Sequence, residues 1–178
     1  MPAISELIKQ ISISLKQDNT DINRKRWSAY IIENTIPIVQ LTELMHHEHP
    51  IAMRFSWVLG DIADNHPEAL RESVPYFFKH RNEIKFPNFN RSLAKFFYLS
   101  GVPEEIEGEA IDELFKWLMD AKMNVTTKTF SLLALHRLTL KHKDLQQELK
   151  LVIEDQLGKT SVSFENKARK ILAELKEK

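Results

Sequence analysis

The stretch that decides the fold is TIPIVQLTELMHHEHPIAMRFSWVLGDIADN, which spans residues 35–65. Its apolar residues recur every three or four positions, the spacing that places them on one side of a helix. Pro37 and Pro50 each stand where such a pattern begins. Proline suits the first turn of a helix because its φ angle is already near the helical value and its missing N–H is not needed there. The stretch therefore predicts two helices, at residues 36–45 and 50–65, joined by a polar turn rich in histidine.

The prolines recur along the chain at a nearly constant interval. The prolines at positions 37, 50 and 67 are followed by others at positions 75, 87 and 103, which lie 38, 37 and 36 residues further on. A period of about 20–50 residues is typical of repeat proteins. The interval predicts five helix pairs, at residues 4–16 with 21–33, 36–45 with 50–65, 67–80 with 87–100, 103–120 with 125–141, and 144–157 with 163–176.

Apolar spacing favours helices throughout, and no segment has the alternation of a strand bounded by hairpin turns. The chain is therefore predicted to be all-α. No linker or low-complexity run divides it, so residues 1–178 are expected to form a single domain. The first and last predicted helices carry lysines and other polar residues opposite their apolar stripes, as the ends of a repeat array require.

Pro37 lies early in the helix expected at residues 36–45, and the pattern R-x-x-W-x-L-G-x-I-A follows at residues 54–63. Together they resemble a HEAT repeat. The resemblance implies a fold of the ARM/HEAT type, a right-handed α-α superhelix (an α-solenoid) of about five HEAT-like helix pairs. HEAT proteins generally bind other macromolecules along the concave face, which the second helix of each repeat lines. By resemblance, then, the chain is a non-enzymatic binding or scaffold module, and a protein is the favoured partner.

The amino-acid composition excludes several classes of protein. Cysteine is absent, which rules out disulfide bonds, thiolate zinc sites, iron–sulfur clusters and cysteine nucleophiles. Only four glycines occur, and they do not cluster. The glycine-rich loops that hold nucleotide phosphates are therefore missing, and we expect no cofactor.

The overall charge favours no class of partner. Lysine and arginine total 25, as do aspartate and glutamate, so attraction to nucleic acid or to a membrane would need a local patch. No run approaches the ~18 apolar residues of a membrane span. The N-terminal residues mix charges with apolar side chains and lack the core of a signal peptide. We expect a cytoplasmic protein that does not enter a membrane.

A helical wheel of residues 50–65 separates two faces. One face carries the apolar residues expected in the core: Ile51, Phe55, Val58, Leu59 and Ile62. The opposite face carries Met53, Trp57, Gly60, Asp61 and Asp64. Trp57 and Asp61 lie one turn apart, so both can contact a common ligand on the concave face. In the alternative interpretation Trp57 is half-buried against the neighbouring repeat and the two aspartates are simply solvated.

The same reasoning applied to residues 87–100 places Arg91, Lys95 and Tyr98 on the face away from the core. The opposite face carries Phe89, Leu93, Phe96 and Ser100. The residues predicted to bind a partner on the concave face are Trp57, Asp61, Arg91, Lys95 and Tyr98.

Local charge leaves the class of partner open. Residues 71–95 hold six lysines or arginines against two glutamates, and a basic groove with aromatic residues can bind a phosphate backbone. Residues 104–113, by contrast, are crowded with acids, and segregated charge of both signs equally favours a protein partner. A continuous basic stripe around Trp57 would favour nucleic acid, whereas the acidic residues on the same face would oppose it.

An enzymatic alternative rests on a second, weaker resemblance. The pair Trp57 and Asp61 is similar to the aromatic and acidic residues with which HEAT-like bacterial DNA alkylation-repair glycosylases hold a damaged base. A carboxylate there stabilises the positive charge of the departing nucleoside while the aromatic ring stacks on the base. The candidates for a second aromatic partner are Trp27 and Trp117.

The run His46-His47-Glu48-His49 has the ligand chemistry of a metal site but not the i, i+4 spacing that places ligands on one side of a helix. It is interpreted as a turn between helices, and no metal site is expected. Serines at positions 28, 56, 92 and 131 recur near one position of the repeat. Their recurrence predicts close packing between helices and not catalysis.

Overall fold

The computed structural model describes residues 3–176, which fold into helices with no strand among them, so the prediction of an all-α protein is confirmed. In chain order the elements are α1 (Ile4–Gln17), α2 (Asp21–Glu33), the 3₁₀ helix η1 (Ile38–His46), α3 (His49–Asn65), α4 (Pro67–Arg71), α5 (Val74–Lys79), α6 (Phe89–Ser100), the 3₁₀ helix η2 (Glu104–Ile106), α7 (Glu107–Met119), α8 (Val125–Leu138), α9 (Leu145–Gln156) and α10 (Val162–Lys176).

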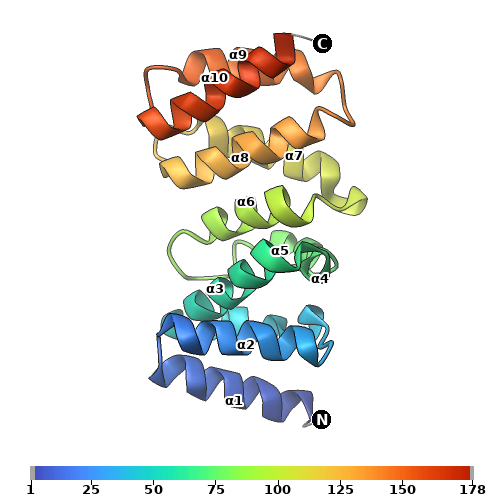
Figure 1. Cartoon of the computed structure of the whole chain (residues 1–178), viewed down its shortest axis with the longest axis vertical. Helices are drawn as coiled ribbons and strands as arrows, with labels where there is room; N and C mark the ends of the chain where they lie inside the picture. The colour runs from blue at the N-terminus through green and yellow to red at the C-terminus, as the bar shows by residue number, and fades with distance from the viewer. Residues whose placement is uncertain (1–2, 177–178) are drawn as a thin grey trace.

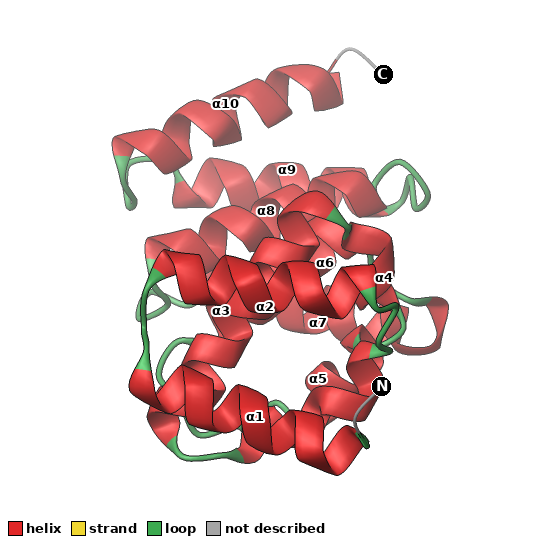
Figure 2. Ribbon diagram, turned by 60° about the horizontal axis from the view of Figure 1, so that its bottom comes forward, coloured by secondary structure: helices red, strands yellow, loops and turns green. Residues whose placement is uncertain are grey.

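The molecule is elongated, and its helices are stacked along the long axis from α1 at one end to α10 at the other (Figure 1). The helices α2, α3, α6, α8 and α10 each contact the next in this order. The remaining helices pack beside them, with α7 and α9 behind α8 and α10 in the view of Figure 1. The loops lie mainly along the two edges of the molecule (Figure 2). One surface is thus formed by α2, α3, α6, α8 and α10.

The predicted apolar face of α3 forms the centre of the core. Every residue of that face is buried, and Phe55, Val58 and Leu59 have no exposed surface. In α6, Leu93 and Phe96 are likewise fully buried. Side chains on the two helices face the same apolar interior, so the opposite faces of both helices must lie on the surface described above.

The structure corrects the helices expected at residues 36–45 and 67–80. The first of these is the 3₁₀ helix η1, in which Ile38, Leu41 and Leu44 are buried. Their spacing of three matches the three residues per turn of a 3₁₀ helix. Residues 67–80 form two short helices, α4 and α5, separated at residues 72–73. Pro75 favours the break, because it has no N–H to donate to the preceding turn and it suits the first turn of a new helix, where it lies in α5.

Other predicted helix ends move by a few residues. The helix expected from residue 103 begins as the 3₁₀ helix η2 and becomes α-helical only at Glu107. The helix expected from residue 87 begins at Phe89, because Asn88 has a left-handed backbone with φ 66°. Asparagine tolerates this conformation better than most residues. The helix expected to reach residue 141 ends at Leu138.

Polar contacts between neighbouring helices recur at sequence separations close to the proline interval. Arg24 and Asp61, 37 residues apart, form an ion pair between α2 and α3. The hydroxyl oxygens of Ser56 and Ser92, 36 residues apart, lie 3.5 Å from each other between α3 and α6. Arg137 of α8 lies 39 residues after Tyr98 of α6 and donates a hydrogen bond to the backbone carbonyl of Tyr98. At these three places, residues about one proline interval apart are neighbours in space; of the recurring serines, Ser56 and Ser92 are such a pair.

A polar cluster at one edge ties the turn that follows α8 to the start of α7. Glu107, whose side chain is 13% exposed, accepts hydrogen bonds from Lys141 Nζ at 2.9 Å and pairs with His142 Nε2 at 2.7 Å. Burial alone raises the pKa of Glu107, but the hydrogen bonds from Lys141 and His142 outweigh it, so the pKa lies below its ordinary value. The charged form of Glu107 is thus stabilised by folding.

We predict that Glu107→Gln destabilises the protein by about 1–2 kcal/mol near neutral pH, because an amide cannot form the charge-assisted bonds. The folded-state pKa is lowered, so the carboxylate's contribution is complete above its ordinary value of 4.5 and is lost as the pH falls through the folded value. Urea unfolding of wild type and variant at about pH 7 and about pH 3 should show the difference shrinking in acid. The exposed Glu109 provides the control, as Glu109→Gln. A difference for Glu107→Gln that is equal at both pH values would contradict the assignment.

Candidate functional site

A groove of about 660 Å³ opens between α3 and α6 and extends to the start of α2. Its walls carry Trp57, the small residues Ser56, Gly60 and Ser92, the loop residues Phe86, Pro87 and Asn88, and six charged side chains: Asp21, Arg24, Asp61, Asp64, Arg91 and Lys95. Four of the five predicted binding residues, Trp57, Asp61, Arg91 and Lys95, therefore line one groove. They come from two neighbouring helices whose buried faces point the same way.

The fifth predicted residue, Tyr98, lies outside the groove lining. Its ring is tilted against Phe130 of α8, with 6.2 Å between ring centroids. The Arg137 guanidinium lies 5.8 Å from the centre of the Tyr98 ring. Tyr98 thus packs in the seam between α6 and α8, the position that the helical wheel could not distinguish from the groove.

Trp57 presents its indole to the groove and is 40% exposed, an unusually large exposure for this side chain. It also borders a small hollow beside Arg54 and the start of α2. No other aromatic ring or cation of the described residues packs on it. This exposure agrees with the alternative interpretation in so far as Trp57 is half-buried, but Asp61 and Asp64 are ion-paired and not simply solvated. Trp57 is available for contact with a ligand.

Asp61 is held by Arg24 of the preceding helix. Arg24 Nε lies 2.5 Å from Asp61 Oδ2, and the two side chains are only 24% and 19% exposed. Arg24 also approaches Asp21, with 3.1 Å between Nη1 and Oδ1. One guanidinium therefore links two carboxylates. The pair joins α2 to α3 at the groove, and Asp61 also borders a smaller hollow of about 200 Å³.

Lys95 is held from the other side of α3. Its Nζ lies 2.6 Å from Asp64 Oδ2 and donates a hydrogen bond to the Gly60 carbonyl oxygen at 3.2 Å. Lys95 is therefore anchored to two groups of α3 from its position on α6. Together, the pairs Arg24–Asp61 and Lys95–Asp64 join α2, α3 and α6 by ion pairs placed on the groove surface.

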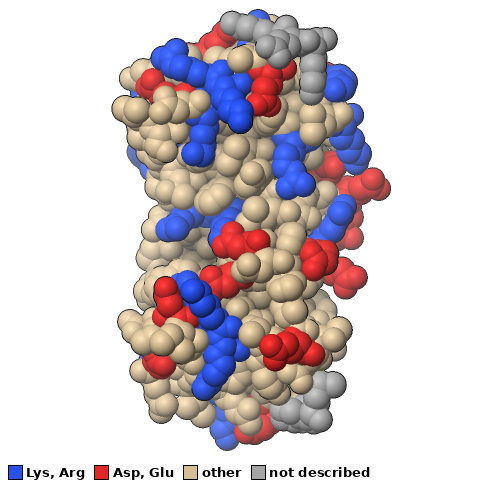
Figure 3. Space-filling model, viewed as in Figure 1, with Lys and Arg blue, Asp and Glu red and all other residues tan. Residues whose placement is uncertain are grey.

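The groove has no continuous basic stripe. Its lining contains three acids and three bases, and Figure 3 shows blue and red side chains mixed over the face that α2, α3, α6, α8 and α10 form. The acidic segment 104–113 does not line the groove either. Glu105 pairs with Lys79, and Glu113 lies near Arg81 and Lys116, all outside the groove.

Neither of the two other tryptophans joins Trp57. Trp27 is 7% exposed, and its indole Nε1 donates to the Ser14 hydroxyl at 2.9 Å. Trp117 of α7 is 2% exposed and packs in the hydrophobic core of the protein. The aromatic residues that do border the groove, Phe86 and Phe96, are buried beneath its surface. A stacked base would therefore meet Trp57 and no exposed second ring of the described residues.

The histidines of the run at residues 46–49 do not meet at one point. His46 Nε2 lies 2.9 Å from the Tyr76 hydroxyl, and His47 Nε2 is 4.0 Å from Glu43 Oε1. His49 is the first residue of α3. Within residues 3–176, no group of three or more histidine or acidic side chains is arranged to hold a metal ion, and no helix of that part is long and apolar enough to cross a membrane.

Arg24 is a groove residue whose role the helical wheels missed. In the sequence it belongs to a short basic run at residues 24–26. Its separation from Asp61, 37 residues, equals the proline interval, so the repeat period applied to charged residues would have found the pair. The loop at residues 86–88 carried no comparable signal, because its position depends on the left-handed backbone of Asn88.

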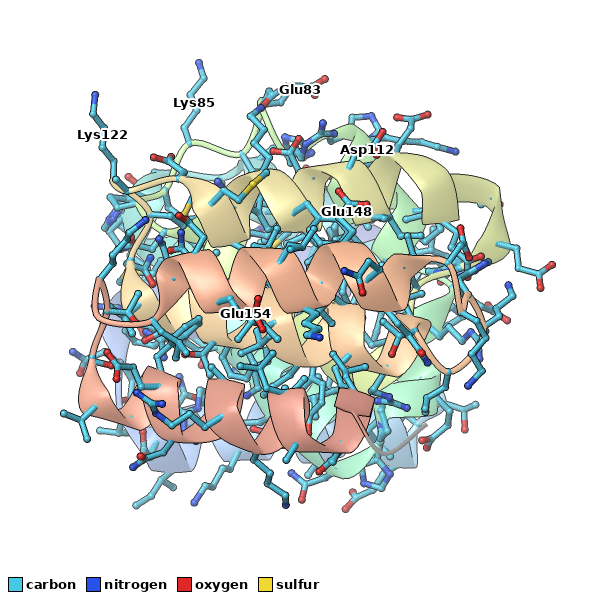
Figure 4. The ribbon with its side chains drawn as sticks, turned by 90° about the horizontal axis from the view of Figure 1, so that it is seen from above. Glu83, Lys85, Asp112, Lys122, Glu148 and Glu154 are labelled. Carbon is cyan, nitrogen blue, oxygen red and sulfur yellow. The ribbon has the colours of Figure 1, made fainter. Side chains whose placement is uncertain are left out.

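We predict that Asp61→Asn lowers the free energy of unfolding by about 1–3 kcal/mol, because the partly buried Arg24 loses a charge-assisted bond. The matched control is Asp112→Asn, at an exposed acid of α7 that forms no ion pair with the described residues and is labelled in Figure 4. That change should stay within about 0.5 kcal/mol. Urea denaturation of both variants measures the effect, and equal losses would mean that the Arg24–Asp61 pair does not hold α2 to α3.

Comparisons of the chain with protein-family models, with characterised proteins and with solved structures found no match. The resemblance to HEAT repeats therefore rests on the residues that carry it. What the groove does is inferred from its geometry and charge alone.

Proposed function

We propose that this chain is a non-enzymatic binding module that holds a segment of a partner protein in the groove between α3 and α6. The observation that carries the proposal is an exposed tryptophan in a groove whose charged side chains, apart from Arg91, are already paired. Tryptophan is enriched among the residues that dominate protein–protein binding energy. Ion pairs that fix the walls before binding reduce the entropy lost when the partner is bound.

The fold proposed with this function is a right-handed α-solenoid of about five HEAT-like helix pairs. Three observations support it: the motif at residues 54–63, the order in which α2, α3, α6, α8 and α10 contact one another, and polar contacts at separations of 36 to 39 residues. In this arrangement the groove lies on the face formed by the second helices of the repeats. That is the face by which HEAT proteins generally bind macromolecules.

The charge of the groove favours a protein over nucleic acid. Binding to a phosphate backbone relies on lysines and arginines that are free to displace counterions. In the groove, Arg24 and Lys95 are already paired with Asp61 and Asp64, and three acids balance three bases. A backbone with one negative charge per nucleotide would meet as many repulsive as attractive groups there.

A second candidate function is nucleic-acid binding, or base excision of the alkylation-repair type. One observation favours it, namely that Trp57 and Asp61 line the same groove. In such an enzyme Asp61 would stabilise the positive charge of the departing nucleoside. Its pairing with Arg24 opposes this role, because the guanidinium already neutralises the carboxylate and adds a positive charge beside it.

Photo-crosslinking tests the protein-binding proposal. A benzoylphenylalanine placed at position 87 lies at an exposed residue of the groove, and one at position 151 lies on α9 at a side chain that is 56% exposed. We expect a discrete protein adduct from position 87 that Trp57→Ala abolishes, and none from position 151. The captured protein, once purified, should bind the wild-type chain and not the variant. Equal adducts from both positions would contradict the groove.

Nucleic-acid binding provides the opposite test. Binding of single-stranded and duplex DNA and RNA can be measured by fluorescence anisotropy at low and moderate salt. If the groove binds protein, any nucleic-acid binding that is seen should be the same in Arg91→Ala and Lys95→Ala as in wild type. Lys85 and Lys122, which extend outward in Figure 4, supply control substitutions to alanine. Salt-dependent binding lost only in the groove variants, or release of alkylated bases that Asp61→Asn abolishes, would replace the protein-binding proposal with the second candidate.

A further inference from the structure

One cation of the groove forms no ion pair with the residues that the structure describes. Arg24 is paired with Asp61 and Asp21, and Lys95 with Asp64. Arg91 is exposed on α6 and forms no ion pair or side-chain hydrogen bond with the residues that the structure describes. Once the internal pairs are counted, Arg91 is the groove cation free to bind an external anion.

The surroundings of Arg91 also favour an anion. It lies in the first turn of α6, which contains no acidic residue, and the N-terminal end of a helix carries a partial positive charge. Trp57 lines the same groove from α3. A guanidinium and an exposed indole in one groove suit a ligand that carries a negative group next to an apolar one.

We propose that the partner segment presents a carboxylate to Arg91 and, beside it, an apolar or aromatic side chain to Trp57; this rests on the protein-binding function proposed above. The planar guanidinium of arginine binds a carboxylate through two parallel hydrogen bonds, which gives direction as well as affinity. The indole face supplies a large apolar contact area at little cost in conformational entropy.

A single carboxylate fits this charge layout better than the alternatives. A nucleic acid brings a charge at every nucleotide, and the carboxylates of Asp21 and Asp64 line the same groove. A basic segment would meet Arg91 directly, and the acids that could attract it are already paired. One acidic residue satisfies Arg91 without disturbing the two ion pairs that hold the walls.

A phage-displayed library of random heptapeptides tests the inference with the whole chain as bait. We expect wild type to enrich peptides with Asp or Glu beside Trp, Phe or Leu. Arg91→Gln should lose the preference for an acid but keep the apolar preference, and Trp57→Ala should lose enrichment altogether. Arg71→Gln is the matched control, because Arg71 on α4 is exposed, forms no ion pair with the described residues and lies outside the groove.

Affinities of one selected peptide make the test quantitative. Arg91→Gln should weaken its binding roughly 10- to 100-fold, the range expected for a hydrogen bond to a charged group, while Arg71→Gln leaves it unchanged. Replacing the acid of the peptide by its amide should weaken binding to wild type equally and have no effect on Arg91→Gln.

The possible failures are distinguishable. Enriched peptides without an acid, or an acid preference that Arg91→Gln retains, would overturn the carboxylate inference and leave the groove as a protein-binding site. The absence of any peptide whose binding Trp57→Ala abolishes would overturn both proposals.

Discussion

The structure depends on the burial of one face of α3. Phe55, Val58 and Leu59 lose all contact with solvent against the helices behind them, and burying each such side chain contributes about 1.5–3 kcal/mol. A helix turns by about 100° per residue, so fixing this face fixes the other. Trp57 is therefore placed on the open surface because its neighbours in sequence are fully buried. The exposure of the indole is a consequence of the core.

Contacts of α3 with the helices on either side of it then determine the shape and charge of the groove. It lies between α2 and α6, and one ion pair joins it to each: Asp61 with Arg24, and Asp64 with Lys95. Exposed ion pairs contribute little stability, but the Arg24–Asp61 pair and Lys95 are largely shielded, and the two pairs join α3 to α2 and to α6 respectively. They set the spacing of the groove walls and neutralise most of its charge. Trp57 and Arg91 are left as the groups without an internal partner, and this is why the groove fits a ligand with one acidic and one apolar group.

Much of this arrangement could be predicted from the sequence. The apolar spacing of residues 50–65 identified the buried face of α3, and the proline interval identified which positions become neighbours. The outcome for Tyr98 shows where a helical wheel fails. A side chain that points away from the core can face either solvent or the next helix, and the choice depends on how α8 crosses α6. The left-handed Asn88 was equally hidden, because it depends on local backbone geometry that apolar spacing does not report. The break before α5, by contrast, has a signal in the sequence, namely Pro75.

The three tryptophans provide the most direct test of the groove. Their indole N–H groups give separate signals in a ¹⁵N–¹H NMR spectrum, and only Trp57 is substantially exposed, whereas Trp27 donates to Ser14 and Trp117 is in the core. Titration with the tightest-binding selected heptapeptide should shift the Trp57 signal progressively and leave the other two in place. A complex that leaves the Trp57 signal unchanged, or that shifts the signals of Trp27 and Trp117 instead, would contradict the assignment of the groove as the binding surface.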